Sequence, residues 1–221
     1  MSETIKHHPT EELLLAYAAG SLPEAFSLAI AAHVSMCDTC RAHVESLEAV
    51  GGSMLDNVGQ AQLSATSFAD TMALIQSDVL STPEPIAPTP SADDENRLPA
   101  PLHDYIGGAL SDVKWRSVGM GVKQAMLDTN GQGSARLLYI PAGTAMPDHG
   151  HRGTELTLVL RGAFRDDEDY FGPGDMEVAT EDHHHTPVAD IAEDCICLAV
   201  TDAPLRFSGL IPRLAQPFLR I

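Results

Sequence analysis

Apolar side chains in the first eighty residues recur every three or four positions, which is the spacing of one face of an α-helix. This pattern predicts four short helices, over residues 11–19, from residue 21, from residue 41 and from residue 67. Gly20 is expected to end the first of them, because glycine often closes a helix. Four short helices bury little apolar surface, so we expect a marginal bundle that a structural metal would stabilise.

The second predicted helix carries the most distinctive face. Phe26, Ile30, His33 and Cys37 share one stripe of it. The residues at 21–24, Ser-Leu-Pro-Glu, resemble a capping box, in which the serine accepts a hydrogen bond from the first amides and the glutamate reaches back. We therefore expect this helix to open at residue 21.

The pattern changes twice after residue 80. Six prolines among Ser, Thr, Ala and acidic residues make 81–101 a linker, because such a composition favours extended conformers and cannot pack a core. Short β-type segments separated by turns follow, at 113–118, 122–127, 135–140, 156–160 and 195–201. We predict an α+β protein with a helical domain at 1–80 and a β-sandwich or barrel at 102–221, whose relative position can change.

The charge and the N-terminus restrict the class of partner and the location. The formal net charge of −18 argues against direct binding of nucleic acid, whose phosphates would be repelled. In residues 1–80, ten acidic residues oppose only Lys6 and Arg41, and the resulting net charge of −8 suits a basic protein partner. No apolar run reaches the ~20 residues of a membrane span, and no hydrophobic signal segment begins the chain, so we expect a cytoplasmic protein.

The four cysteines form two close pairs. Cys37 and Cys40 make a Cys-x-x-Cys motif, which in a reducing compartment is more often a metal or redox site than part of a disulfide framework. Cys195 and Cys197 share one face of a predicted strand. We interpret this second pair as buried small hydrophobes, and an oxidisable pair close to a metal is the alternative.

A zinc site is indicated around the first cysteine pair. His33 and Cys37 lie four residues apart on one helical face, and Cys40 follows at the spacing of a zinc knuckle. A redox pair would be expected at the start of a helix after a strand, but the sequence before Cys37 is helical. His7 or His8 is the obvious fourth donor, and His43 is a residual alternative.

A second metal site is indicated in the segment 143–162. On an extended backbone His149, His151 and Glu155 point to the same face, so two imidazoles and a carboxylate can converge on one ion. Three further histidines stand at 183–185, after the turn at Gly174 and Asp175. Such donors suit Zn, Fe, Mn or Ni.

The spacing of this segment resembles the first signature motif of the cupin family: Gly143, five residues, His-x-His, three residues, Glu155, six residues and Gly162. In cupins a later strand supplies the fourth ligand after a Gly-Asp turn, which implies His185 here. His183 has the same parity and competes with it, whereas His184 should point the other way. Here a proline directly precedes the Gly-Asp pair, which departs from the family pattern.

The helical His/Cys set resembles the zinc-binding anti-sigma domain of bacterial regulators that hold extracytoplasmic-function (ECF) sigma factors inactive. Together with the cupin motif, it makes the chain similar to ChrR-type anti-sigma factors, which join such a domain to a C-terminal cupin. The resemblance implies an all-α bundle with a structural zinc and an all-β cupin barrel with Zn, Fe, Mn or Ni. The implied ligands are His8, His33, Cys37 and Cys40 for the zinc and His149, His151, Glu155 and His185 for the cupin metal.

The implied function is regulatory. We expect a cytoplasmic anti-sigma factor, not an enzyme, that binds and inhibits an ECF sigma factor and releases it on an oxidative signal. The resemblance implies singlet oxygen or an organic peroxide, or another small molecule, as the signal at the cupin. The alternative is a metal-dependent cupin enzyme of the dioxygenase type with an accessory helical domain. An enzyme should show further acid or base groups around its metal, and the sequence shows no such set.

Overall fold

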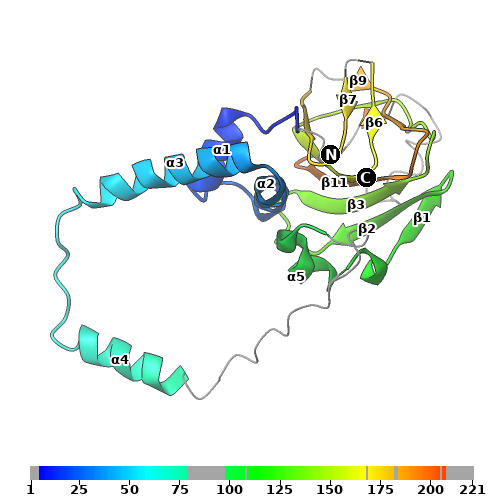
Figure 1. Cartoon of the computed structure of the whole chain (residues 1–221). Coiled ribbons are helices and arrows are strands. Elements are labelled where there is room, and N and C mark those ends of the chain that lie inside the picture. Colours follow the sequence, from blue (N-terminus) through cyan, green and yellow to red (C-terminus); the bar gives the residue numbers. More distant parts are fainter. Residues whose placement is uncertain are drawn as a thin grey trace.

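Helices occupy the N-terminal part of the chain and strands the C-terminal part in the computed structural model, which describes residues 5–78, 98–107, 109–167, 169–181, 184–204 and 206–207 (Figure 1). The helices are α1 (Glu11–Ala18), α2 (Glu24–Met36), α3 (Asp38–Leu55), α4 (Ser67–Asp78) and α5 (His103–Ile106), with 3-10 turns η2 (Ala100–Leu102) and η3 (Leu110–Asp112). The predicted change from helical to β structure is confirmed.

The first helix begins and ends where local chemistry predicts. The Leu13 N–H donates to Thr10 Oγ1 over 3.3 Å, which satisfies one of the open amides of the first turn. Glu11 and Glu12 stand in that turn, where negative charge is favourable to the helix dipole. Gly20 has a φ of +65°, and its left-handed backbone closes the segment.

The predicted capping box of the second helix is wrong. α2 begins at Glu24 after Pro23, and no side chain caps it. Ser21 Oγ donates instead to the Ala16 carbonyl oxygen over 3.1 Å. The Glu24 carboxylate accepts hydrogen bonds from Tyr105 Oη over 2.7 Å and from the Asn130 N–H over 2.8 Å. The glutamate therefore binds groups far away in sequence rather than the start of its own helix.

The third helix begins at Asp38, three residues before the predicted start at residue 41. Cys37 is both the C-cap of α2 and the N-cap of α3, so the two helices follow each other directly. α1, α2 and α3 pack together, with Leu14 and Val44 buried between them. The fourth helix does not join this bundle. Its side chains at 68–77 are exposed, and Figure 1 shows it away from the other helices. The predicted bundle of four helices is thus a bundle of three with α4 outside it.

Among the residues that the structure describes, the strands form three sheets. They are β1 (Arg116–Gly119), β2 (Val122–Leu127), β3 (Ser134–Ile140), β4 (His149–Gly150), β5 (Glu155–Arg161), β6 (Phe164–Arg165), β7 (Tyr170–Phe171), β8 (Met176–Ala179), β9 (His184–His185), β10 (Val188–Ala189), β11 (Cys195–Thr201) and β12 (Arg206–Phe207). The large sheet has the order β1-β2-β3-β11-β5-β8, and the small ones are β10-β6-β7 and β12-β4-β9. Every pairing is antiparallel.

Four of the five predicted strands correspond to β2, β3, β5 and β11 within one residue at each end. The first strand begins at Arg116, three residues after the predicted start, because Val113 caps η3 and its carbonyl oxygen accepts a turn hydrogen bond from the Trp115 N–H. Along β3 and β11 alternate residues point to two different cores. Leu137 and Leu198 face the helices, whereas Cys195 and Cys197 face the inside of the barrel.

α2 is buried on both sides because it lies between the other helices and the large sheet (Figure 1). It contacts α1 and α3 on one side and β3, β5 and β11 on the other. Ala29, Ile30 and His33 are fully buried there. One apolar cluster therefore runs from the helices into the outer face of the barrel. The burial of these apolar side chains away from water holds the helices and the barrel together.

The segment after the proline-rich stretch belongs to this cluster. Leu98 and Leu102 are buried, and η2 packs against α2. Residues 79–97 lie outside the described residues, so the structure does not test most of the predicted linker. The division at 1–80, 81–101 and 102–221 and the independent movement of the two halves stay predictions. The shared core is a feature that the composition of the linker did not indicate.

Candidate metal centres

The structure brings His8, His33, Cys37 and Cys40 together at the junction of α2 and α3. One ligand atom from each side chain lies within 4.8 Å of all the others. His8 Nδ1 is 3.5 Å from Cys37 Sγ and 3.4 Å from Cys40 Sγ, and His33 Nε2 is 3.3 Å from Cys40 Sγ. In a tetrahedral zinc site with the usual bond lengths, nitrogen and sulfur donors are about 3.6 Å apart. The donor set therefore has the size that zinc requires.

The electrostatics of this group also suit a cation. Burial raises the pKa of Cys40 to about 12, and the nearby Cys37 contributes to the rise. Burial lowers the pKa of His33 to about 4, so its imidazole is neutral and can donate a lone pair. A metal deprotonates the thiols that it binds, so two thiolates and two neutral imidazoles would hold a zinc ion closed to solvent ligands.

His7 lies elsewhere. Its ring contacts Phe171 in the barrel, with 4.5 Å between ring centroids, and its Nε2 is 3.6 Å from Asp169 Oδ1. Of the two N-terminal histidines, only His8 therefore joins the cysteines. His43 is absent from the groups of potential ligands found among the described residues.

Three imidazoles converge inside the barrel. His149 and His185 are paired residues of β4 and β9, and His151 follows β4 with the same parity. His185 Nε2 lies 3.2 Å from His149 Nε2 and 3.3 Å from His151 Nε2. Two nitrogens that bind one ion at about 2.1 Å are separated by about 3.0–3.4 Å, depending on the angle. The three histidines thus match a shared ion.

The ring orientation of His149 is set by the backbone. Its Nδ1 lies 2.9 Å from the Pro147 carbonyl oxygen, which fixes this nitrogen as the donor and leaves Nε2 with its lone pair. Burial lowers the pKa of His149 to about 4, which also favours the neutral ring. A carbonyl that holds the remote nitrogen of a ligand histidine is typical of metal sites.

Two carboxylates behind His185 are functional candidates that the sequence analysis missed. Glu177 Oε1 lies 2.8 Å and Asp166 Oδ2 3.5 Å from His185 Nδ1. Burial lowers the pKa of His185, but the hydrogen bond and charge of Glu177 outweigh burial and leave a net rise. Glu177 alternates with Met176 on β8, and its parity was the signal that places it inside the barrel.

Glu155 lies beside His151, but it is outside the group of three histidines whose ligand atoms lie within 4.8 Å of one another. Its Oε2 is 3.8 Å from His151 Nδ1, and its Oε1 accepts a hydrogen bond from Thr157 Oγ1 over 3.2 Å. Burial raises the pKa of Glu155 to about 7, and the charge of Glu177 adds to the rise while Arg136 opposes it. The ionised carboxylate is therefore costly in this interior and would gain from a nearby cation.

The remaining histidines and cysteines that the sequence suggested differ in their exposure to solvent. His184 is exposed on the opposite face of β9 from His185, as its parity predicts, and His183 lies outside the described residues. Cys195 and Cys197 are buried in the barrel core. The hydrogen bond between them and burial raise the pKa of Cys197 well above its usual value, and the charges of Glu155 and Glu177 contribute. The Cys197 thiol is therefore close enough to the two carboxylates near the histidines for their charges to act on it.

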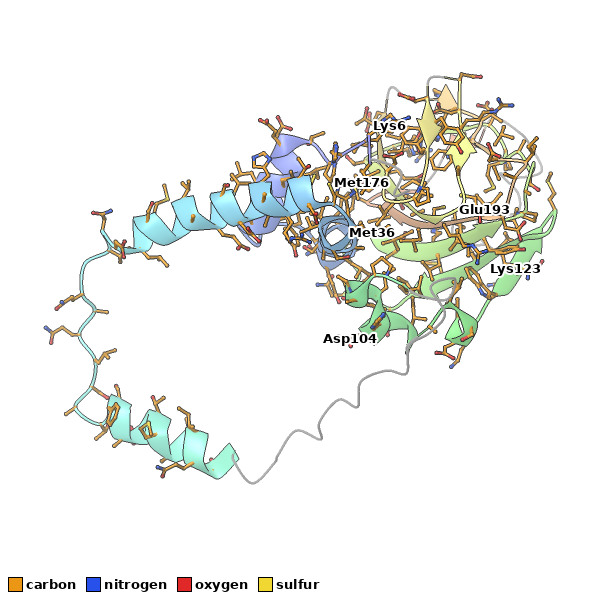
Figure 2. All side chains as sticks on the ribbon, viewed as in Figure 1. Lys6, Met36, Asp104, Lys123, Met176 and Glu193 are labelled. Carbon is orange, nitrogen blue, oxygen red and sulfur yellow. The ribbon has the colours of Figure 1, made fainter. Side chains whose placement is uncertain are left out.

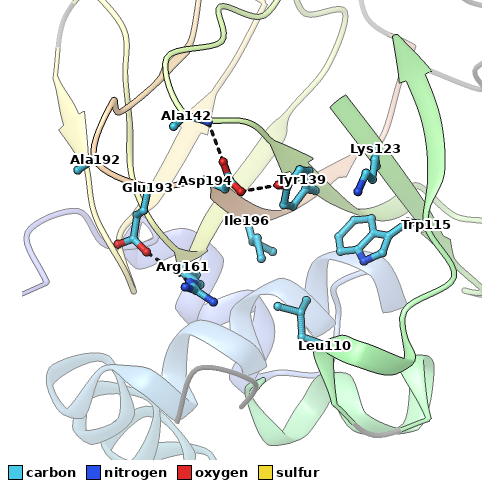
Figure 3. A pocket seen from close by; sticks show the side chains of 10 residues that line it. All are labelled: Leu110, Trp115, Lys123, Tyr139, Ala142, Arg161, Ala192, Glu193, Asp194 and Ile196. Atoms are coloured by element: carbon cyan, nitrogen blue, oxygen red, sulfur yellow. Dashed lines mark hydrogen bonds and ion pairs between the residues drawn. The ribbon is translucent and has the colours of Figure 1, made fainter. Parts of the chain in front are cut away.

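A separate pocket of about 470 Å³ opens on the outer face of the large sheet (Figure 3). Trp115, Lys123 and Tyr139 line one side of it. The Asp194 carboxylate accepts hydrogen bonds from the Tyr139 hydroxyl and the Ala142 N–H, and other polar groups on its wall are paired as well. It is lined by none of the histidines of either metal group.

Comparisons with known proteins agree with this arrangement. Residues 104–204 match the family described as the ChrR cupin-like domain. The anti-sigma-E factor ChrR of Cereibacter sphaeroides is 54% identical over 218 residues, which are 99% of this chain and 100% of that protein. A chain in the crystal structure of Rhodobacter sphaeroides SigE in complex with the anti-sigma ChrR matches with a TM-score of 0.77 and 51% identity, covering 90% of this chain and 100% of that one. An RmlC-like cupin protein of Ralstonia eutropha matches 46% of this chain and 70% of its own at 25% identity, with a TM-score of 0.40.

The fold and the two donor groups define a cupin protein joined to a helical His/Cys unit. Since its similarity to the Cereibacter protein extends over the whole length, the chain belongs to the ChrR family of anti-sigma factors. The predictions of this family, of its fold class and of a regulatory role rather than enzymatic activity are confirmed. Within the part of the chain that the structure describes, no helix is sufficiently long and apolar for a membrane span.

Proposed function

We propose that this chain binds an ECF sigma factor through its helices and keeps the sigma factor from RNA polymerase. The observation that carries the proposal is the exposed apolar surface of α4 and of the end of α3. Val50, Met54, Phe68, Leu74 and Ile75 are more than half exposed there. A surface of this kind marks a protein interaction site. The similar crystal structure of SigE in complex with the anti-sigma ChrR supports a sigma factor as the partner.

Charge supports the same partner. Residues 1–80 carry a net charge of −8, and most of the acidic side chains on α1 and α3 are exposed. An acidic surface around apolar side chains would steer a basic sigma factor to the helices, whereas apolar burial would supply most of the affinity. A sigma factor acts on cytoplasmic RNA polymerase, so the proposal includes a cytoplasmic location.

We propose a structural zinc ion for the helical group, held by His8, His33, Cys37 and Cys40. The support is a complete set of four protein donors at zinc-like separations, which leaves no open position for a substrate. Zinc bound there would fix the angle between α2 and α3 and tie the N-terminal segment to both. The proposed role is therefore to stabilise the helices that meet the sigma factor.

For the cupin group we propose a divalent metal bound by His149, His151 and His185, with Glu155 as the fourth donor. The imidazole separations support the three histidines, and the cost of ionising the buried Glu155 supports a cation near its carboxylate. Imidazole and carboxylate donors suit Zn, Fe, Mn or Ni. The ion would supply a charge that orders the three rings around it.

We propose that the cupin receives an oxidative signal, singlet oxygen or an organic peroxide, and that the helices then release the sigma factor. Imidazole rings and the thiols of Cys195 and Cys197 are oxidisable groups inside the barrel. The large contact between α2 and the sheet supports a route from barrel to helices. A signal shifts binding only if it changes the relative free energies of two states, so this contact must differ between them.

Co-expression of the full chain with each ECF sigma factor of the same genome tests the proposal. We expect a stable one-to-one complex with one of them, which competes with core RNA polymerase. Ile75→Glu should weaken that complex about tenfold or more, because a buried charge replaces an apolar contact. Ser77→Glu adds the same charge to the same helix on its polar side and is the control. The absence of a complex with every sigma factor would overturn the proposal.

A further inference from the structure

The segment that precedes His8 is docked on the barrel. The N–H groups of Lys6 and His7 donate to Asp175 Oδ1 over 2.6 and 2.9 Å. The Met176 N–H donates to the His7 carbonyl oxygen over 3.0 Å. In Figure 2, Lys6, Met36 and Met176 are seen where the helices meet the barrel. Residues 5–7 therefore lie along the turn that precedes β8, although this turn is far from them in the sequence.

The turn has the features of a docking site for this segment. Asp175 is 5% exposed, and its second oxygen accepts a hydrogen bond from the Gly172 N–H over 2.9 Å. A buried carboxylate that loses two of three backbone donors is strongly destabilised. Gly174 has a φ of +89°, and a Cβ there would lie 2.5 Å from Ile5 Cδ1. The absence of a side chain at this glycine lets the segment approach.

One end of the docked segment enters the helical metal group. His8 follows His7 directly, and its Nδ1 faces the two cysteine sulfurs. The position of one of the four zinc donors, His8, therefore depends on the segment docked on this turn.

The other end enters the cupin group. Met176, which bonds to His7, is followed by Glu177 on β8, whose Oε1 lies 2.8 Å from His185 Nδ1. A path therefore joins His185 to His8. His185 binds Glu177, Glu177 is the chain neighbour of Met176, the Met176 N–H binds the His7 carbonyl oxygen, and His7 is the chain neighbour of His8. Met176, Glu177 and His185 on the barrel side of this path are buried, where hydrogen bonds are strong and costly to leave unmade, whereas His7 is half-buried and His8 is exposed.

We propose that residues 5–8 form a strap that couples the two metal groups through Asp175. An ion in the cupin holds His185 and Glu177 in place, keeps the turn at 172–176 in its docked form and thereby keeps His8 on the zinc. Loss of the cupin ion loosens the turn, frees the strap and removes one zinc ligand. The coupling is reciprocal, so zinc in the helical group favours the cupin ion by the same factor. The inference rests on the proposed function only in that both groups bind metal.

Hydrogen exchange of the amides of residues 5–8 in the full, zinc-loaded chain tests the strap. His149→Ala removes a cupin donor that does not touch the strap, and we expect exchange at Lys6 and His7 to rise about 5–150-fold, the usual range of coupling between sites. His184→Ala, on the exposed face of the same pairing, is the matched control and should leave exchange unchanged. Unchanged exchange at Lys6 and His7 in His149→Ala would overturn the proposal.

Zinc transfer to a chromophoric chelator gives a second, independent measurement. Asp175→Ala and Ile5→Ala weaken the strap from its two sides, and each should speed release of the zinc held by His8. In either background, a further His149→Ala change should add little, because the coupling element is already broken. Asp202→Ala removes another carboxylate that binds a backbone amide, Thr154 N–H, in a barrel turn and is the control.

Equal release rates in Asp175→Ala, Ile5→Ala and the wild type, or a full additional effect of His149→Ala in both strap variants, would contradict the strap. Neither measurement contains a sigma factor. A failure of the strap would therefore leave sigma-factor binding intact, and a failure to bind a sigma factor would leave both strap measurements unchanged.

Discussion

His149 and His185 face each other directly across the two-residue pair of β4 and β9, with their Nε2 atoms 3.2 Å apart. Directly opposed residues of an antiparallel pair point to the same side of the sheet. The geometry of the cupin group therefore depends on a very short ladder. His151, Glu177 and the Pro147 carbonyl orient the rings within it.

His185→Ala should reduce the metal content of the full chain by one ion, because it removes a central imidazole of the cupin group. His184→Ala should keep the wild-type content, since that ring is exposed on the opposite face. Elemental analysis of the purified variants measures both. Loss of the ion in the His184 variant, with retention in the His185 variant, would reverse the assignment.

Glu177→Gln should weaken metal binding in the cupin about 10–100-fold, the usual effect of losing a carboxylate that orients a ligand histidine. The amide keeps the shape of the side chain but not the charge that raises the pKa of His185. Competition with a chelator of known affinity measures the change. Glu193→Gln, at the surface ion pair with Arg161, should have wild-type affinity. Equal affinities of the two variants would remove Glu177 from the site.

Cys37→Ser and Cys40→Ser should each release one zinc ion per chain and abolish inhibition of the sigma factor, because the helical group loses a thiolate. Changes at His149 or Glu155 should keep inhibition and spoil the response to oxidants, because both thiolates and His33 stay in the helical group even when His8 is freed. Cys195→Ser should retain both ions. Metal analysis together with a transcription assay separates these outcomes, and inhibition by zinc-free Cys37→Ser at the wild-type level would count against a structural role for the ion.

Leu102→Ala should lower the free energy of unfolding by about 2–5 kcal/mol, the cost of a cavity at a fully buried leucine. Leu63→Ala, at a residue that is 79% exposed, should stay within about 0.5 kcal/mol of the wild type. Urea denaturation of both variants gives the comparison. A small effect at Leu102 would mean that η2 is dispensable to the core shared by α2 and the barrel.

Local patterns were sufficient for much of the secondary structure. The strands β2, β3, β5 and β11 and the helix α1 follow from their apolar patterns and from the turn residues that bound them. β11 is buried along its whole length, because one of its faces packs towards the helices and the other towards the inside of the barrel. The start of α2 was mispredicted because the Glu24 carboxylate binds Tyr105 and Asn130 rather than the first turn of its own helix. No local pattern contains such distant partners.

The sequence by itself indicated most of the candidate donors of both groups, because metals require particular atoms at spacings that a helix or a strand can present on one face. Histidines and cysteines four or two residues apart were recognisable for that reason. Only the tertiary structure decided between His7 and His8, placed Asp166 and Glu177 behind His185, and docked residues 5–7 on Asp175. The docking of residues 5–7 joins segments about 170 residues apart, which the packing of α2 on the barrel brings together.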